Sequence, residues 1–171
     1  TEAVDVVMWP YIREFSDRSV PKTIFQGRKL FDETACRKLQ RRLIGLSGEE
    51  LAHPENADAL STVWGKLYRG EIIKQNHLRF EDLSRIGTYE DGLFNLCYFA
   101  HVKSAIYIPD YLSHYRKNTG MTSKYRSQLA SQWKTLFSDM RVYIEKSGND
   151  SDLKKALDNR ISLSIIGLGL N

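Results

Sequence analysis

The sequence predicts an α+β fold in which mostly short strands pack with helices. Over the first two thirds of the chain, short runs of β-branched and aromatic residues alternate with helical patterns. An apolar run with helical spacing fills residues 88–99. Residues 129–144 and 153–168 repeat an apolar residue every three or four positions. This spacing is typical of amphipathic helices, so we expect the chain to end in two of them.

The first strands are expected to form a hairpin. Residues 4–15 are rich in β-formers, although Pro10 favours an edge strand or a bulge at its position. A polar turn is expected at residues 16–21. A returning strand is expected at residues 23–26, ending at Gly27.

The next segment predicts a helix with a basic surface. Asp32 is expected to cap this helix, which runs to about Ile44 and stops at Gly45. No aromatic residue interleaves with its positive charges, so we expect a solvated face rather than a nucleic-acid site. The basic residues are Arg37, Lys38, Arg41 and Arg42.

Residues 61–69 alternate in the way a strand does. In a strand, Trp64, Lys66 and Tyr68 share one face. An aromatic, a cation and a phenol on one face suggest a pocket floor that stacks on a sugar ring and hydrogen-bonds its edges. The alternative is a half-exposed strand in which the Lys66 ammonium reaches solvent.

A helix over residues 71–76 and a short strand over residues 77–80 precede the apolar run at 88–99, which predicts a buried helix. Glu90 and Asp91 stand at the N-terminus of that helix. First-turn carboxylates suit the partial positive charge there, and most act only as caps. At the wall of a pocket, a carboxylate held in this way can instead take a proton from a substrate hydroxyl.

Residues 104–116 have β character, which Pro109 and Asp110 interrupt with a turn or bulge. Residues 117–122 follow with hydrogen-bond donors and a glycine. This segment is a candidate lid over an anionic group, or else a plain connection to the next helix.

Composition narrows the class of protein. Lys and Arg total 25 against 21 Asp and Glu, a net charge of +4. This mild excess permits an anionic ligand without indicating a nucleic-acid binder. Cys36 and Cys97 lie on apolar patterns without metal-ligand spacing and predict buried thiols in a reducing compartment, with one disulfide between them as the alternative. No apolar stretch is long enough to span a bilayer, and we expect the cytoplasm, or the inner face of a membrane, as the location.

Four segments together resemble the C-terminal half of the catalytic domain of a family 2 glycosyltransferase, which has the GT-A fold. VWGKLYR at residues 63–69 is followed by a short helix and LRF. YEDGLFN at residues 89–95 resembles the ED motif of that family. AIYIPDYLSHYRKN at residues 105–118 resembles its segment ending in Tyr-Arg, and Gly-Met-Thr at residues 120–122 is similar to the close of that segment. The resemblance covers roughly residues 4–122.

The resemblance implies an inverting transfer of a sugar from a nucleotide-diphosphate donor to an acceptor hydroxyl, in the synthesis of a bacterial surface polysaccharide. It implies that Asp91 is the general base and that Glu90 orients the acceptor or holds Asp91. It places His114 and Arg116 near the diphosphate, with His114 also reaching the metal. The implied substrate-binding residues are Trp64, Lys66, Tyr68, His114, Arg116 and Thr122.

One departure from the family matters. The nucleotide-binding strands and the Asp-x-Asp metal motif of the family precede the matched segments, and residues 4–122 contain no Asp-x-Asp. We therefore expect part of a longer enzyme, with residues 1–124 as the acceptor-side portion and residues 125–171 as a helical extension. A divalent metal, manganese or magnesium, is expected to bind the full enzyme rather than this chain alone.

The partners implied are a nucleotide-diphosphate sugar and a glycan or another hydroxyl acceptor. Exposed apolar faces of such a part would also favour a homo-oligomer. The alternative function is a non-catalytic module that binds another protein through the last two helices.

Overall fold

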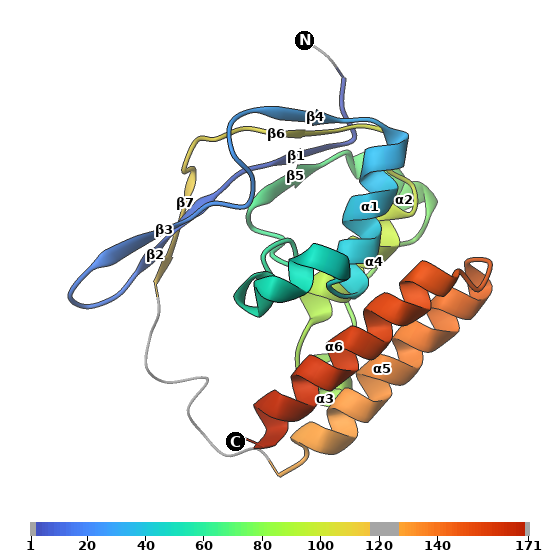
Figure 1. Ribbon diagram of the computed structural model, residues 1–171. Helices are drawn as coiled ribbons and strands as arrows, with labels where there is room; N and C mark the ends of the chain where they lie inside the picture. Colours follow the sequence, from blue (N-terminus) through green and yellow to red (C-terminus); the bar gives the residue numbers. More distant parts are fainter. Residues whose placement is uncertain (1–2, 117–126, 170–171) are drawn as a thin grey trace.

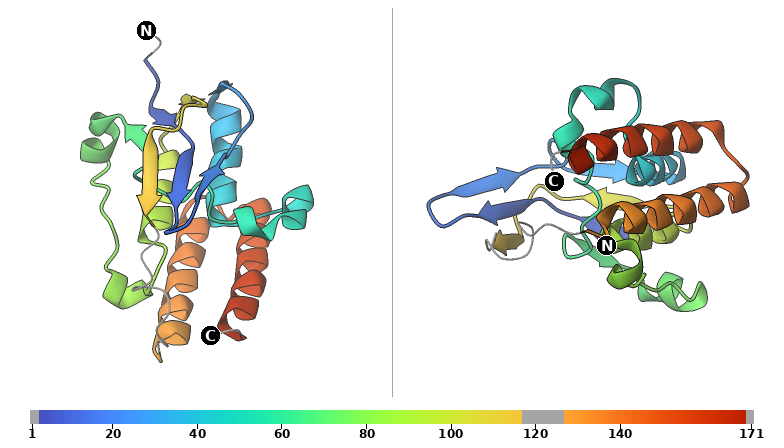
Figure 2. Two further views of the ribbon diagram at one scale, coloured as in Figure 1. Left: turned by 90° about the vertical axis from the view of Figure 1, so that its left-hand side faces the viewer. Right: turned by 90° about the horizontal axis from the view of Figure 1, so that it is seen from below.

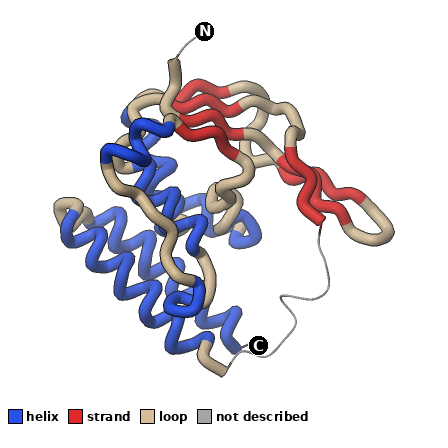
Figure 3. Tube along the Cα trace, turned by 180° about the vertical axis from the view of Figure 1, so that it is seen from behind, coloured by secondary structure: helices blue, strands red, loops and turns tan. Residues whose placement is uncertain are grey.

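The computed structural model describes residues 3–116 and 127–169 as a mixed α and β protein with two mixed sheets. The strands gather at one end of the molecule and the helices at the other (Figures 1 and 3). The larger sheet has the order β4-β6-β1-β5 and consists of β1 (Val6–Met8), β4 (Lys29–Phe31), β5 (Lys66–Tyr68) and β6 (Ala105–Tyr107). The smaller sheet has the order β3-β2-β7 and consists of β2 (Tyr11–Glu14), β3 (Ser19–Lys22) and β7 (Ser113–Arg116).

Two segments of the chain run through both sheets. β1 continues into β2, and β6 continues into β7. β1 pairs with β6 in the larger sheet and β2 pairs with β7 in the smaller one, and both pairings are parallel. Pro10 separates β1 from β2 because it has no N–H to give to a ladder. A longer turn that contains Pro109 separates β6 from β7. The predicted interruption at Pro109 is confirmed. At Pro10 the structure has a break between two strands that are each central in their sheet, rather than the expected edge strand or bulge.

Other strand predictions are wrong in their bounds. The returning strand is β3 at Ser19–Lys22 rather than residues 23–26, because the hairpin closes early, with Phe15 N–H donating to Arg18 O at 2.9 Å. Pro21 lies within β3, an edge strand, where a missing N–H is tolerated. No strand forms at residues 77–80. The strand predicted over residues 61–69 is only β5, because residues 61–65 fold into a turn.

The helices follow the sequence patterns closely. α1 (Glu33–Ile44) begins after Asp32, whose Oδ1 accepts from Ala35 N–H at 2.8 Å, and ends where Gly45 N–H donates to Arg41 O at 3.1 Å. Two 3₁₀ turns follow, at Gly48–Ala52 and Pro54–Asn56. The remaining helices are α2 (Gly70–Gln75), α3 (Leu83–Ile86), α4 (Glu90–Phe99), α5 (Leu129–Lys146) and α6 (Ser151–Gly169).

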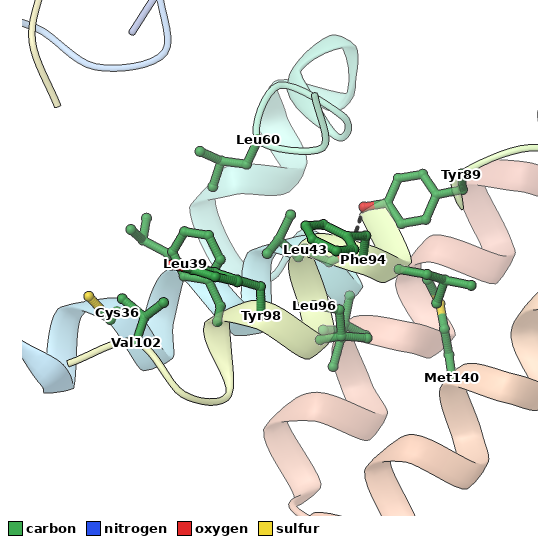
Figure 4. Packing of buried hydrophobic residues seen from close by; sticks show 14 of the residues in the cluster. Cys36, Leu39, Leu43, Leu60, Tyr89, Phe94, Leu96, Tyr98, Val102 and Met140 are labelled. Carbon is green, nitrogen blue, oxygen red and sulfur yellow. Dashed lines mark hydrogen bonds between the residues drawn. The ribbon is translucent and has the colours of Figure 1, made fainter. Parts of the chain in front are cut away.

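A single buried cluster joins the sheet to the helices. α4 lies in its centre, packed on α1, and Figure 4 shows side chains of both helices meeting there with Met140 of α5. α5 and α6 lie side by side, as the view from below shows (Figure 2). Their apolar stripe, which includes Leu136 and Leu157, is buried in this same core. Each fully buried side chain of this size contributes about 1.5–3 kcal/mol, so the two helices help to stabilise the whole chain.

Some predictions about burial need adjustment. Ile165, which belongs to the apolar spacing of residues 153–168, is 61% exposed rather than part of the core. Cys36 is buried, Cys97 is half-buried, and both are free thiols. In the described ranges, no helix combines the length and apolar character needed to cross a membrane.

Candidate functional site

The carboxylates of the ED motif lie in the first turn of α4. Oδ2 of Asp91 accepts a hydrogen bond from the Val63 backbone N–H at 3.3 Å. Among the described residues, Oδ1 of Asp91 has no hydrogen-bond partner. Glu90, next to it, is half-buried. The helix N-terminus and the turn at residues 61–65 therefore hold the Asp91 carboxylate while one of its oxygens stays available.

Asn95, one helical turn after Asp91, ties this turn to α4. Asn95 is fully buried, and its Nδ2 donates to Ser61 O at 2.7 Å and to Asp91 O at 2.9 Å. The Tyr68 hydroxyl donates to Asn95 Oδ1 at 2.8 Å. Burial raises the pKa of Tyr68, which keeps this donor protonated. The structure thus makes Tyr68 a support of the site through Asn95, a residue that was not among the predicted site residues.

Lys66 lies beneath the same turn rather than on an open pocket floor. It is 5% exposed, and its Nζ donates to Leu60 O at 2.8 Å and to Thr62 O. Its ammonium therefore does not reach solvent in the way the alternative reading of this strand expected. Burial lowers the pKa of Lys66 to about 7, and the nearby Asp91 opposes that shift. The position of Lys66 supports the backbone that carries Trp64.

Trp64 belongs to a group of three aromatic rings at the surface. Trp64 is 36% exposed, and its ring stacks on Tyr115 of β7, with ring centroids 5.6 Å apart and 9° between the planes. Tyr11 of β2 meets Trp64 edge-on at 4.7 Å. Ser113 Oγ donates to Trp64 O at 3.4 Å and accepts from Trp9 Nε1 at 2.8 Å. These contacts hold the turn at residues 61–65, which contains Trp64, against the smaller sheet.

His114 and Arg116 lie on the other face of that sheet. Alternate residues of a strand point to opposite faces, and Tyr115, between them, stacks on Trp64. His114 Nδ1 lies 2.6 Å from Glu14 Oε1, and Glu14 also accepts from the Ser19 hydroxyl. The hydrogen bonds from Ser19 and His114 lower the pKa of Glu14. The structure therefore does not bring His114 and Arg116 together with Asp91 on one face.

The remaining predicted features give no metal site in the described part of the chain. No group of three His, Cys, Asp or Glu side chains there could hold a metal ion. An Asp-x-Asp does occur further along, at Asp150 and Asp152, but Asp150 caps α6 by accepting from Asp152 N–H at 2.7 Å. Thr122 and the candidate lid at residues 117–122 lie outside the described residues.

Two arginines of the basic surface of α1 bind other parts of the protein, whereas the sequence predicted a solvated face. Arg37 donates to Phe99 O at 3.0 Å and to Ala100 O at 2.8 Å, which satisfies carbonyls at the end of α4. Arg41 pairs with Glu50. Both residues line a groove of about 570 Å³ between α1 and the turn that joins α5 to α6. These arginines have structural roles that account for their positions.

The geometry separates the predicted site residues into two sets. Asp91 and Glu90 lie near Trp64, Lys66 and Tyr68, around the turn at residues 61–65. His114 and Arg116 lie with Glu14 on the far face of the smaller sheet. Comparison with known proteins adds no family, because no protein-family model matches the chain and no curated protein does.

Proposed function

We propose that this chain is the acceptor-side part of an inverting glycosyltransferase, with Asp91 as its general base. The observation that carries the proposal is the Asp91 carboxylate. It is fixed by the Val63 N–H beside an exposed tryptophan, and Oδ1 has no partner among the described residues. The likeness of residues 89–95 to the ED motif supports the same assignment. We propose further that residues 1–124 belong to a GT-A domain.

The proposed reaction requires a general base at the position of Asp91. An acceptor hydroxyl attacks the anomeric carbon of the donor, the bond from that carbon to the nucleotide diphosphate breaks, and the configuration inverts. The hydroxyl proton passes to Asp91 Oδ1 as the new glycosidic bond forms. Glu90, one residue before, orients the acceptor in this scheme.

The aromatic rings provide the acceptor side of the site. A sugar presents an apolar face that packs on an aromatic ring, and its hydroxyls require polar partners at the edge. Trp64 is both exposed and attached to the turn that holds Asp91. In this proposal, Trp64 and its stacking partner Tyr115 position the acceptor for transfer. The acceptor is a glycan or another molecule with a free hydroxyl, in the synthesis of a bacterial surface polysaccharide.

The donor side is assigned to a longer parent protein. A divalent metal would offset the charge of the departing diphosphate. The described residues do not offer a complete ligand set for it, and His114 lies on the opposite face of the smaller sheet from Trp64. We propose that segments of the parent outside this chain supply the nucleotide and metal contacts.

The test is sugar transfer by the parent enzyme carrying Asp91→Asn. Loss of transfer by a factor of at least about 10² with unchanged folding is expected when a general base is removed. Asp158→Asn is the matched control, because Asp158 lies exposed on α6. Transfer that survives in Asp91→Asn would remove Asp91 as the base.

A separate titration tests the division between this chain and its parent. Uridine diphosphate is added to the isolated chain in a calorimeter, with and without Mn²⁺. Absence of binding by a folded chain agrees with the acceptor-side proposal. Metal-dependent binding would show that the chain holds a donor site of its own.

A further inference from the structure

Arg160 is a buried arginine in the middle of α6, far along the sequence from the ED motif. Its side chain is among the few buried charged groups of the described chain, with 8% of its surface exposed. Its Nη2 donates to the Tyr89 hydroxyl at 2.8 Å, and its guanidinium lies over the Tyr89 ring, 4.0 Å from the centroid. Its Nη1 pairs with Asp58 Oδ1 at 3.1 Å. A buried charge is retained only where such partners compensate its desolvation.

The position of Arg160 depends on a close approach of α6 to the end of α1. A Cβ at Gly45 would lie 2.0 Å from Ala156 O, so only glycine leaves room for α6 there. Arg160 then reaches past Gly45, and its Nε donates to Ile44 O. In this way the last helix satisfies a carbonyl that α1 leaves free at its C-terminus.

Tyr89 connects this contact to the candidate base. It adopts the left-handed conformation (φ 70°), which a tyrosine rarely does, and it stands directly before the first turn of α4. Its hydroxyl donates to Leu43 O at 2.6 Å, as the dashed line in Figure 4 shows. Arg160 therefore holds Tyr89 from two sides, through the face of its ring and through its hydroxyl oxygen.

A second path leads from Arg160 through Asp58. Asp58 belongs to the segment that continues into the turn at residues 61–65, and its backbone carbonyl accepts from Ser61 N–H at 3.1 Å. The next residues of that segment include Val63, whose N–H holds Asp91 Oδ2. Both the helix that carries Asp91 and the turn that binds its carboxylate are thus tied to one guanidinium.

We infer that Arg160 is a positioning residue for Asp91. α6 then belongs to the site and is not only a helical extension of the chain. The inference about geometry stands on the contacts alone. Its meaning for catalysis rests on the proposed function. Arg160 holds the first turn of α4 and the turn at residues 61–65 in one arrangement, so that Asp91 keeps its orientation.

Amide hydrogen exchange on the 171-residue chain tests the inference without any substrate. In Arg160→Met, the amides of Val63 and Leu93 should exchange with solvent at least about tenfold faster than in the original chain. In the original chain, local opening at these amides must break the Arg160 contacts, and the variant does not have those contacts. Leu93 N–H donates to Tyr89 O within this first turn. The amide of Ile108, bonded to Met8 O across the larger sheet, is the internal reference and should keep its rate. Lys155→Met, an exposed change on the same helix, should alter none of the three.

The relative exchange rates of the Val63, Leu93 and Ile108 amides decide whether Arg160 positions Asp91. Equal acceleration at all three amides would show a general structural role, and unchanged rates at Val63 and Leu93 would show no coupling. Either result overturns the inference. If Arg160→Met does not fold, Tyr89→Phe replaces it, since it removes the hydroxyl that Arg160 contacts but keeps the ring. The same local pattern, smaller in size, is then expected.

Transfer by the parent enzyme separates this inference from the proposed function. Arg160→Met should lower kcat with little change in KM for the acceptor, and Arg160→Lys should restore part of it. A parent that transfers no sugar even with Arg160 intact would defeat the proposed function and leave the exchange result standing. Normal kcat in Arg160→Met would defeat the inference alone.

Discussion

The ring of Tyr89 occupies the space that a side chain at position 92 would need. A Cβ at Gly92 would lie 2.1 Å from Tyr89 Cε1, far inside the contact distance of two carbons. The spacing of tyrosine and glycine in the motif is therefore a packing requirement. Glycine at the third position after Tyr89 lets the ring fold back over the first turn of α4.

Gly92→Ala is expected to destabilise the chain by about 1–3 kcal/mol, because the added methyl group overpacks a buried site. Urea unfolding followed by circular dichroism measures the change. Gly70→Ala is the control, since nothing lies within 4 Å of a Cβ there, and it should stay within about 0.5 kcal/mol of the original chain. Equal stability of the two variants would contradict the packing argument.

How far the sequence predicts this site depends on how local each feature is. α1 could be predicted because a cap, an apolar spacing and a stop residue all lie within one segment. α4 could be predicted from its apolar spacing and its two first-turn carboxylates. Asp91 at the first turn of α4 follows from the same local pattern. The surroundings of Lys66 could not be predicted, because its burial depends on the turn at residues 61–65 folding over it.

Long-range pairing explains the remaining differences. Which residues of β7 face Trp64 is decided by its register with β2, where Arg13 pairs with Tyr115. The sequence shows that residues of β7 alternate between two faces, but it does not show which of these faces lies toward Trp64. Arg160 was missed for a related reason, since one arginine on an amphipathic helix gives no signal until Gly45 brings α6 against α1.

Asn95→Leu is expected to cost about 2–4 kcal/mol of stability, because it keeps the volume but leaves Ser61 O and the Tyr68 hydroxyl without their partner. Tyr68→Phe removes one of the same hydrogen bonds and should cost about 1 kcal/mol. The double variant should lose less than the two changes summed, since they share the bond. Additive losses in urea unfolding would show that the two side chains act independently.

The two thiols are expected to react slowly in the folded chain. Burial raises the pKa of Cys36 to about 11 and also raises the pKa of Cys97, so little thiolate forms at pH 8. Titration with a chromogenic disulfide reagent at pH 8 should therefore find little fast-reacting thiol until urea is added, and then two per chain. Rapid reaction of Cys36 without denaturant would contradict its burial.

Lys66 should make stability depend on pH in the alkaline range. Burial lowers its pKa to about 7 in the folded chain, against an ordinary value of about 10.5 in the unfolded chain. Between these two values the unfolded chain binds a proton that the folded chain does not, so stability rises with pH there. Below pH 7 the lysine is charged in both states, and its desolvation lowers stability by a constant amount.

The measurement is urea unfolding at pH 7, 8.5 and 10, with Lys66→Met as the comparison. Relative to this variant, the original chain should gain about 1 kcal/mol per pH unit over that range. Other groups that titrate there occur in both proteins, so they cancel in the difference. Lys155→Met, at an exposed position on α6, should track the original chain at every pH. A difference between the original chain and Lys66→Met that stays flat from pH 7 to 10 would show that Lys66 keeps its proton through its bonds to Leu60 O and Thr62 O.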